Sequence, residues 1–265
     1  MAHRAPRKSL GQHFLTDRNI LGAIADAAEV GSGDTVIEVG PGRGALTAVL
    51  AERTRRVIAV ELDSALARSL AAAAPPNVEV VEADARSIEV TALLGGCAPY
   101  KMLGNLPYYA AMPILRRFLE SDCRPEQAAV LVQREVAEQM CARPGTMSLV
   151  SLAVQLFGSA RTTRIVRPGS FTPPPKVTSA VVAVALYDSL AEGVDDAEGF
   201  FVLARAGFSA PRKQLRNALS GGLGVAHVEA ERLLEAAGVE ASRRAQTLSM
   251  GEWASLYRAW RSAEG

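Results

Sequence analysis

The chain has 265 residues, 49% of them apolar and 22% charged, with a formal net charge of +1. That length accommodates one large domain, or one domain with a small appendage, and the composition is typical of a globular, soluble protein. The absence of a long apolar run excludes a membrane span, and the basic N-terminus has no apolar stretch after it, so it is not a secretory signal.

The first two thirds of the chain alternate short β-branched runs with longer helical stretches. This rhythm predicts a parallel, doubly wound α/β sheet with helices on both faces. The later run Ser179–Tyr187 has no such helix after it, and we expect an edge strand there, antiparallel in one interpretation. The other predicted strands are Thr35–Val39, Arg56–Val60, Val78–Val81, Tyr100–Leu103 and Ala128–Val132. The helices expected between them are Ala45–Arg53, Ser64–Ala73, Pro113–Glu120 and Glu135–Cys141.

Beyond Tyr187 the sequence changes character. Residues 188–198 are acidic and contain glycine, which suits a linker, and only helical patterns follow. We therefore predict a larger domain at 1–188 and a small all-α domain at 189–265, which is too short to hold a comfortable core alone. Its predicted helices are Phe200–Phe208, Lys213–Leu219, Val228–Ala237 and Met250–Ser262.

Three cysteines, Cys97, Cys123 and Cys141, lack the paired spacing of a zinc site. We expect reduced thiols in a cytoplasmic protein and no bound metal.

A glycine-rich turn follows the first predicted strand. Gly40, Gly42 and Gly44 alternate with other residues and open a helix, so the backbone can approach a ligand beside free helix N–H groups. Glu61 ends the second strand, where a carboxylate can accept both hydroxyls of a ribose. Asp84 follows the third strand, at the level of the base. Together the three features predict an adenosine-containing ligand, but do not separate a nicotinamide or flavin cofactor from S-adenosylmethionine.

The residues after the fourth strand, Asn105-Leu106-Pro107-Tyr108, help to distinguish between these cofactors, because they suit the transfer of a methyl group. Ligands of doubly wound sheets bind outside the carboxyl ends of the strands. There the Asn105 side-chain oxygen and the Leu106 carbonyl can accept both protons of an amino group and aim its lone pair at a methyl group. Pro107 stiffens the turn, and Tyr108 can stack on a base. In isolation the motif is more typical of a β-turn; its position after a matching cofactor site favours the catalytic interpretation.

Phe171 offers a second aromatic ring, in a proline-rich loop at residues 171–176. An extruded adenine could lie between Tyr108 and Phe171. A core phenylalanine beside a proline-rich connection is an equally good interpretation of the residue alone.

Basic residues form local clusters that could grip RNA phosphates despite the near-neutral total charge. For any one cluster, a solvated surface is the commoner case. The clusters are Arg4, Arg7 and Lys8; Arg212, Lys213 and Arg216; and Arg243 with Arg244.

With these motifs in order, the chain closely resembles the KsgA/RsmA (Dim-type) family of small-subunit rRNA adenine N6-dimethyltransferases. The resemblance runs nearly end to end. It rests on Leu10–Leu15, Val36–Gly42, Glu61–Asp63, Asp84-Ala85, Gly104–Tyr108, Phe171–Val177, Ser179–Val181, Arg212–Asn217 and Arg244–Ser249. Three segments depart from the family pattern, at Tyr109–Ala111, Thr146–Ser148 and Pro211, and none of them touches the Asn105–Tyr108 motif.

The resemblance implies a seven-stranded class I (Rossmann-like) methyltransferase sheet with a small C-terminal all-α domain that helps to dock the substrate. It implies a monomer that dimethylates two adjacent adenines in a 3′-terminal hairpin loop of small-subunit (16S) rRNA, within an immature subunit during ribosome biogenesis. S-adenosylmethionine is the implied cofactor, and its implied contacts are Gln12, His13, Leu15, Gly40, Gly42, Glu61, Leu62, Asp84, Ala85 and Asn105.

Three alternatives stay open at this point. An Erm-like enzyme would methylate large-subunit rRNA; the Arg212–Asn217 segment and the ending around Ser249 favour the small-subunit interpretation. A non-catalytic nucleic-acid-binding factor could use the same fold, although the Asn105–Tyr108 motif and the cofactor acids are intact. A nicotinamide-dependent oxidoreductase would need hydride-transfer residues, and we find none.

Overall fold

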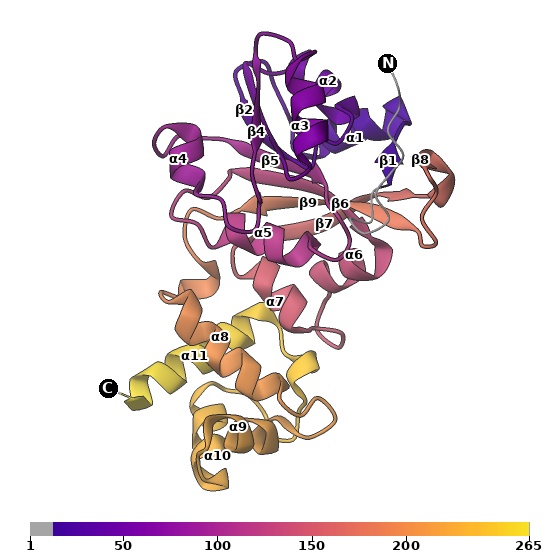
Figure 1. Cartoon of the computed structure of the whole chain (residues 1–265). Coiled ribbons are helices and arrows are strands. Elements are labelled where there is room, and N and C mark those ends of the chain that lie inside the picture. The colour runs from indigo at the N-terminus through magenta and orange to yellow at the C-terminus, as the bar shows by residue number, and fades with distance from the viewer. Residues whose placement is uncertain (1–12, 265) are drawn as a thin grey trace. The chain divides into compact units, whose positions relative to one another are not determined.

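The computed structural model describes residues 13–264 (Figure 1). The chain divides into two compact units. One, here the sheet unit, comprises the residues up to Ala137 together with Ala160–Leu186. The other, here the helical unit, comprises Glu138–Ser159 together with the residues from Tyr187 onward.

A seven-stranded sheet forms the centre of the sheet unit, with strand order β4-β3-β2-β5-β6-β9-β7. Its first five strands are parallel, and β9 runs antiparallel to β6. All residues of β2 are buried, so both faces of the sheet are covered, as a parallel sheet requires. The fold class predicted from the sequence is confirmed. The strands are β2 (Thr35–Val39), β3 (Arg56–Glu61), β4 (Val78–Glu82), β5 (Lys101–Asn105), β6 (Gln127–Gln133), β7 (Gly158–Val166) and β9 (Ser179–Leu186).

The predicted edge position of the run from Ser179 is wrong. β9 lies inside the sheet, because the unpredicted strand β7 pairs along its outer side. The residues of β7 are mostly polar and exposed, so they lack the apolar run or alternation that signals a strand in sequence.

Helices α1 and α2 pack on one face of the sheet, where the core contains Ile24 of α1, Leu50 of α2 and Val36 of β2. Asp17 begins α1 by accepting a hydrogen bond from the Asn19 backbone N–H, as N-cap residues do. The helices that start in this unit are α1 (Arg18–Ala27), α2 (Ala45–Ala51), α3 (Ser64–Ala71), α4 (Val90–Leu94), α5 (Ala111–Leu119) and α6 (Arg134–Met140).

A second, two-stranded sheet joins segments that are far apart in sequence. Strand β1 (Phe14–Leu15) pairs antiparallel with β8 (Phe171–Thr172), which follows a short 3-10 turn at Pro168–Ser170 (Figure 1). The Thr16 N–H continues this contact by donating to the Ser170 carbonyl at 3.2 Å. Residues Phe14–Thr16 are thereby anchored to the chain between β7 and β9.

The helical unit packs around Trp253, whose side chain is fully buried. A Cβ atom on Gly207 of α8 would lie 2.5 Å from the Trp253 ring, so the close approach of α8 and α11 requires glycine there. No helix among residues 13–264 is both long and apolar enough to cross a membrane. The helices of this unit are α7 (Leu149–Gln155), α8 (Ala197–Phe208), α9 (Leu215–Leu223), α10 (His227–Ala236) and α11 (Met250–Glu264).

Two of the three cysteines are joined, contrary to the expectation of reduced thiols. Cys97 and Cys123 form a disulfide with their Cα atoms 5.4 Å apart. They precede β5 and β6, which are adjacent parallel strands, so their amino ends lie side by side. A separation of 26 residues in sequence gives no sign of this proximity.

Candidate active site

A pocket opens at the carboxyl ends of β2, β3 and β5, where ligands bind in doubly wound sheets. The segment that contains β1 forms its opposite wall. Most residues predicted for the cofactor and the reaction meet here. The predicted residues that line it are His13, Leu15, Gly40, Gly42, Glu61, Leu62, Asn105, Leu106, Pro107 and Tyr108.

The glycine-rich turn shapes the floor of the pocket. Gly42 has φ +57°, a left-handed conformation that favours glycine, and a Cβ atom there would lie 3.1 Å from the Phe14 ring. The guanidinium of Arg43 lies over the same ring, 4.3 Å from its centroid. The β1 segment therefore lies directly against the glycine turn, and a side chain at position 42 would crowd the Phe14 ring.

Glu61 is buried in the pocket wall and is held by two backbone N–H groups. Gly42 donates to its Oε2 and Asp63 donates to its Oε1, both at 2.9 Å. Burial raises the pKa of this carboxyl, against the lowering effect of those backbone donors. Its orientation is thus fixed before any ligand binds, and each oxygen keeps a lone pair for a hydroxyl.

Glu38 is a pocket residue that sequence reasoning missed. Its side chain is 1% exposed, and within residues 13–264 its Oε2 has no hydrogen-bond partner. Burial raises its pKa to about 8, and the charge of Glu61 acts in the same direction. An acid between the apolar residues Ile37 and Val39 of a buried strand was the available signal.

Asn105 ends β5 at the reaction side of the pocket. Its side-chain nitrogen donates to the backbone carbonyl of His13 at 3.1 Å. Because a carbonyl can only accept, this contact assigns the amide and leaves the Asn105 oxygen as an acceptor. The Leu106 N–H donates to Leu131 on β6 at 3.2 Å, which fixes the turn after Asn105.

Tyr108 stands beside Asn105 with its ring and hydroxyl both held. The hydroxyl is 2.7 Å from the Ser179 Oγ, and the ring stacks on His13 with 5.9 Å between centroids. Burial raises the pKa of Tyr108, so the hydroxyl stays protonated. The His13 Nδ1 lies 2.8 Å from the Pro173 carbonyl, which ties this stack to β8. Tyr109 also lines the pocket and is 56% exposed.

Three predicted site residues do not line the pocket. Asp84 follows β4 but pairs bidentately with Arg86, which holds the pKa of its carboxyl below the usual range. Ala85 beside it is buried. Phe171 is 3% exposed and belongs to the hydrophobic core next to Leu15. Gln12 lies outside the described residues.

The predicted basic clusters differ in how far their charges are already satisfied. Arg212 and Lys213 are exposed, whereas Arg216 pairs with Glu231 of α10 at 2.7 Å. The first cluster, Arg4, Arg7 and Lys8, lies outside the described residues.

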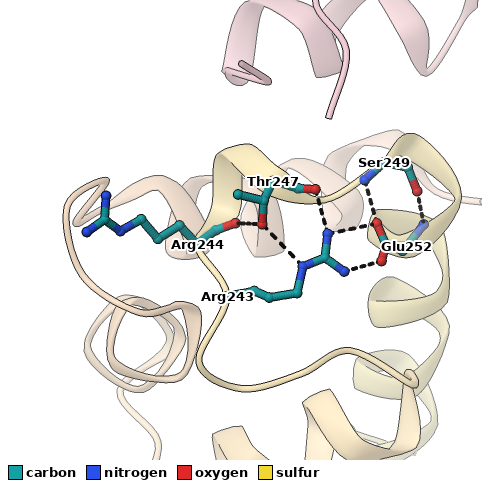
Figure 2. A network of polar contacts seen from close by, with 5 residues as sticks. All are labelled: Arg243, Arg244, Thr247, Ser249 and Glu252. Carbon is teal, nitrogen blue, oxygen red and sulfur yellow. Dashed lines mark hydrogen bonds and ion pairs between the residues drawn. The ribbon is translucent and has the colours of Figure 1, made fainter. Parts of the chain in front are cut away.

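Arg243 and Arg244, predicted as a pair, have different surroundings (Figure 2). The Arg243 guanidinium binds both carboxylate oxygens of Glu252 and the backbone carbonyl of Thr247. Glu252 also accepts from the Ser249 N–H at 2.7 Å and thereby caps α11. Arg244 is exposed, with its side chain directed away from this network (Figure 2). The segment around Ser249 therefore has a structural role: it connects the start of α11 to the loop that contains Arg243.

The pocket fits the cofactor that the sequence implies. The carboxylates of Glu38 and Glu61 face it, and no Lys, Arg or His of residues 13–264 forms a salt bridge with either. Burial raises the pKa of both carboxyl groups, and a ligand with ribose hydroxyls and positive charge compensates the cost of ionising them. S-adenosylmethionine has both, and the glycine turn lets its chain lie against the backbone.

Comparison with known proteins also indicates an S-adenosylmethionine-dependent methyltransferase. Residues 3–256 match the family described as "Ribosomal RNA adenine dimethylase". A protein of Dehalococcoides mccartyi called "Ribosomal RNA small subunit methyltransferase A" is 47% identical over 94% of this chain and 87% of its own length. One of the same name from Geobacter metallireducens is 40% identical over 98% of this chain and 97% of its own length.

Solved structures support the fold. The 23S rRNA methyltransferase ErmE superimposes with a TM-score of 0.74 at 27% identity, over 93% of this chain and 98% of its own. A dimethyladenosine transferase from Plasmodium falciparum superimposes with a TM-score of 0.80 at 23% identity, over 95% of this chain and 98% of its own. The chain therefore belongs to the ribosomal RNA adenine dimethylase family and is an S-adenosylmethionine-dependent methyltransferase.

Proposed function

We propose that this enzyme dimethylates the N6 amino groups of two adjacent adenines in a hairpin loop near the 3′ end of small-subunit rRNA. The product is N6,N6-dimethyladenosine, and the substrate is the rRNA within an immature small ribosomal subunit. The observation that carries the proposal is the amide of Asn105, a residue that lines the pocket, held by His13 so that its oxygen remains an acceptor. The names of the relatives that match over nearly the whole chain support the choice of rRNA.

The cofactor half of the site positions the methyl donor. When bound, S-adenosylmethionine supplies an electrophilic methyl group on a positively charged sulfonium. Glu61 accepts the ribose hydroxyls while its two backbone donors keep it oriented. Gly40 and Gly42 provide the close backbone approach, and Leu62 and Leu15 bound the pocket. Asp84 exchanges its pairing with Arg86 for the amino group of the cofactor's base.

The reaction half activates the amino group of the target adenine. The lone pair of adenine N6 is delocalised into the ring and is a poor nucleophile. The Asn105 oxygen and the Leu106 carbonyl accept hydrogen bonds from its two N–H groups and draw the nitrogen toward a tetrahedral geometry, with the lone pair aimed into the pocket. When the N6–methyl bond forms and the sulfur–methyl bond breaks, the nitrogen loses one proton, which passes to solvent. Such positioning is worth about 7–11 kcal/mol in favourable cases. Pro107 keeps the turn rigid.

Tyr108 holds the target base by stacking. Its hydroxyl is fixed by Ser179, so the ring presents a rigid surface on which an extruded adenine lies. Phe171, the second proposed stacking residue, is buried in the core, so its contact with the base requires residues 171–176 to move.

The relatives favour small-subunit over large-subunit rRNA. Proteins at 40–47% identity are called small-subunit methyltransferases, whereas the similarity to the 23S rRNA enzyme ErmE is 27%. We also propose that the helical domain at 189–265 docks the ribosomal particle through Arg212 and Lys213, which are exposed. Arg216 contributes once its pairing with Glu231 is exchanged, and Arg4, Arg7 and Lys8 add contacts from the N-terminus. The protein acts in the cytoplasm as a monomer.

A deletion strain tests this assignment. Two methyl groups on N6 block Watson–Crick pairing, so reverse transcription stops at the modified adenines. Deletion should abolish two adjacent stops near the 3′ end of small-subunit rRNA, and the wild-type gene should restore them while an Asn105→Ala gene does not. Unchanged small-subunit stops, or a loss confined to large-subunit rRNA, would refute the assignment.

A further inference from the structure

Strand β7 carries a set of exposed arginines that none of the assigned sites uses. It lies at one end of the strand order, so only β9 neighbours it in the sheet. Arg161 and Arg164 on β7, and Arg167 directly after it, are all exposed. Ile165 between them is 51% exposed. We call Arg161, Arg164 and Arg167 the β7 arginines.

The charge of this edge has one sign only. Residues 159–178 contain the β7 arginines and Lys176, and no aspartate or glutamate. No carboxylate within residues 13–264 forms an ion pair with Arg161, Arg164 or Arg167. This contrasts with Arg216 and Arg243 of the helical unit, whose charges glutamates already neutralise. The β7 edge therefore presents unneutralised positive charge to a partner.

The same segment leads to the mouth of the pocket. After Arg167 the chain makes the turn Pro168–Ser170 and enters β8, which pairs with β1 in the pocket wall. The Thr16 N–H binds the Ser170 carbonyl, and His13 binds that of Pro173. At ~3.3 Å per residue, the β7 arginines span about 20 Å of extended chain. They therefore lie on the chain segment that runs along the sheet edge and leads directly into β8.

We propose that the β7 arginines bind the sugar-phosphate backbone of the substrate rRNA that flanks the target adenines. This proposal rests on the proposed function. The guanidinium fork matches phosphate oxygens in two-point contacts, and the exposed Ile165 offers an apolar surface to a ribose. Charged residues also protect edge strands from pairing with other sheets. Charges of either sign would protect an edge strand. Binding to RNA, a polyanion, requires positive charge alone, which is what this strand carries.

The test is the triple variant Arg161→Gln/Arg164→Gln/Arg167→Gln, with small subunits from a strain that lacks the modification. Its matched control is Arg18→Gln/Arg55→Gln/Arg68→Gln, which removes the same charge from exposed arginines of the same unit. We expect the β7 variant to bind the particle at least about tenfold more weakly. The slope of log affinity against log salt should fall by about 2, since each phosphate contact on a single strand contributes ~0.7. The control should retain both values.

Further measurements distinguish the loss of an RNA contact from a folding defect of the variant. S-adenosylmethionine affinity, measured by calorimetry, should be unchanged, and the KM for particles should rise while kcat stays within about twofold. The single variants Arg164→Gln and Arg167→Gln should each show part of the change in salt slope, so the test survives a poorly folding triple variant.

Several outcomes would overturn the proposal. An unchanged salt slope would show that the β7 arginines do not touch phosphate. Self-association of the variant with unaltered particle binding would assign them to edge protection. Weaker binding to particles but not to protein-free small-subunit rRNA would point to an acidic ribosomal protein. Each leaves the proposed function standing if the wild type methylates the particle; if it does not, both proposals fall.

Discussion

The pocket and the helical unit differ in how their charged side chains are paired. Glu38 and Glu61 lie in the pocket wall at 1% and 7% exposure, without a salt bridge to any described cation. Arg243 and Glu252 of the helical unit neutralise each other and satisfy a helix cap and a loop carbonyl (Figure 2). A buried charge is costly unless it is paired.

This difference distinguishes the pocket, which binds a ligand, from the Arg243 network, which supports the fold. The pocket acids lower the stability of the free protein and are compensated by the ligand, whereas the Arg243 network is paired within the protein and stabilises it. Substitutions in the two regions should therefore move different quantities: binding and turnover in one, unfolding in the other.

The largest effect is expected from Asn105→Ala. Losing one of two acceptors for the N6 protons should reduce single-turnover methyl transfer by about 10²–10³-fold, as for loss of one oxyanion-hole donor. Cofactor affinity should change far less. The exposed Asn19→Ala is the matched control and should turn over like the wild type. Equal rates for the two variants would remove Asn105 from the reaction.

Glu61→Ala should act on binding. Loss of a preoriented, charge-assisted contact to the ribose should raise the dissociation constant of S-adenosylmethionine by about tenfold or more. Calorimetry measures this directly, with Glu52→Ala, an exposed acid of the same unit, as the control. Wild-type affinity in Glu61→Ala would refute the ribose contact.

Arg243→Gln should leave cofactor binding intact and destabilise the helical unit. It removes several hydrogen bonds from a partly exposed network, for an expected loss of about 1–2 kcal/mol in the free energy of unfolding. Its neighbour Arg244→Gln should cost close to nothing, because Arg244 is exposed. Denaturant unfolding compares them, and equal stabilities would contradict the structural role of the network.

The effect of Glu38 should appear in how the stability of the protein depends on pH. Its folded-state pKa is raised from 4.5 to about 8, so the folded protein holds a proton that the unfolded chain releases. Stability from this group is therefore present below pH 4.5 and declines as pH rises toward about 8. Glu38→Gln should flatten that decline in Tm without ligand. An identical pH profile in the variant would show that Glu38 is not the group responsible.

The central sheet and the position of the pocket were predictable because their causes are local. The buried strands β2 and β3 are rich in β-branched residues, and the glycine turn, Glu61 and Asn105 each lie at the carboxyl end of a parallel strand. The carboxyl ends of parallel strands share one edge, so these residues had to meet. Strand β7 escaped prediction because its exposed, polar residues carry no burial pattern.

What the sequence could not reveal depends on contacts between distant segments or on competing partners. The Cys97–Cys123 disulfide forms because two strands are neighbours, not because of any spacing. Asp84 lies where an acid that binds the cofactor is expected, but it forms an ion pair with Arg86, two residues away. The sequence predicts Phe171 as a stacking residue. In the structure β8 pairs with β1, and the Phe171 ring lies in the core.

The most direct test of the central claim is methyl transfer from labelled S-adenosylmethionine to undermethylated small ribosomal subunits, with the product nucleosides identified by mass spectrometry. We predict N6,N6-dimethyladenosine in the small-subunit rRNA, and no label in it when Asn105→Ala replaces the wild type on the same timescale. Label in large-subunit rRNA alone, or in neither rRNA, would contradict the account.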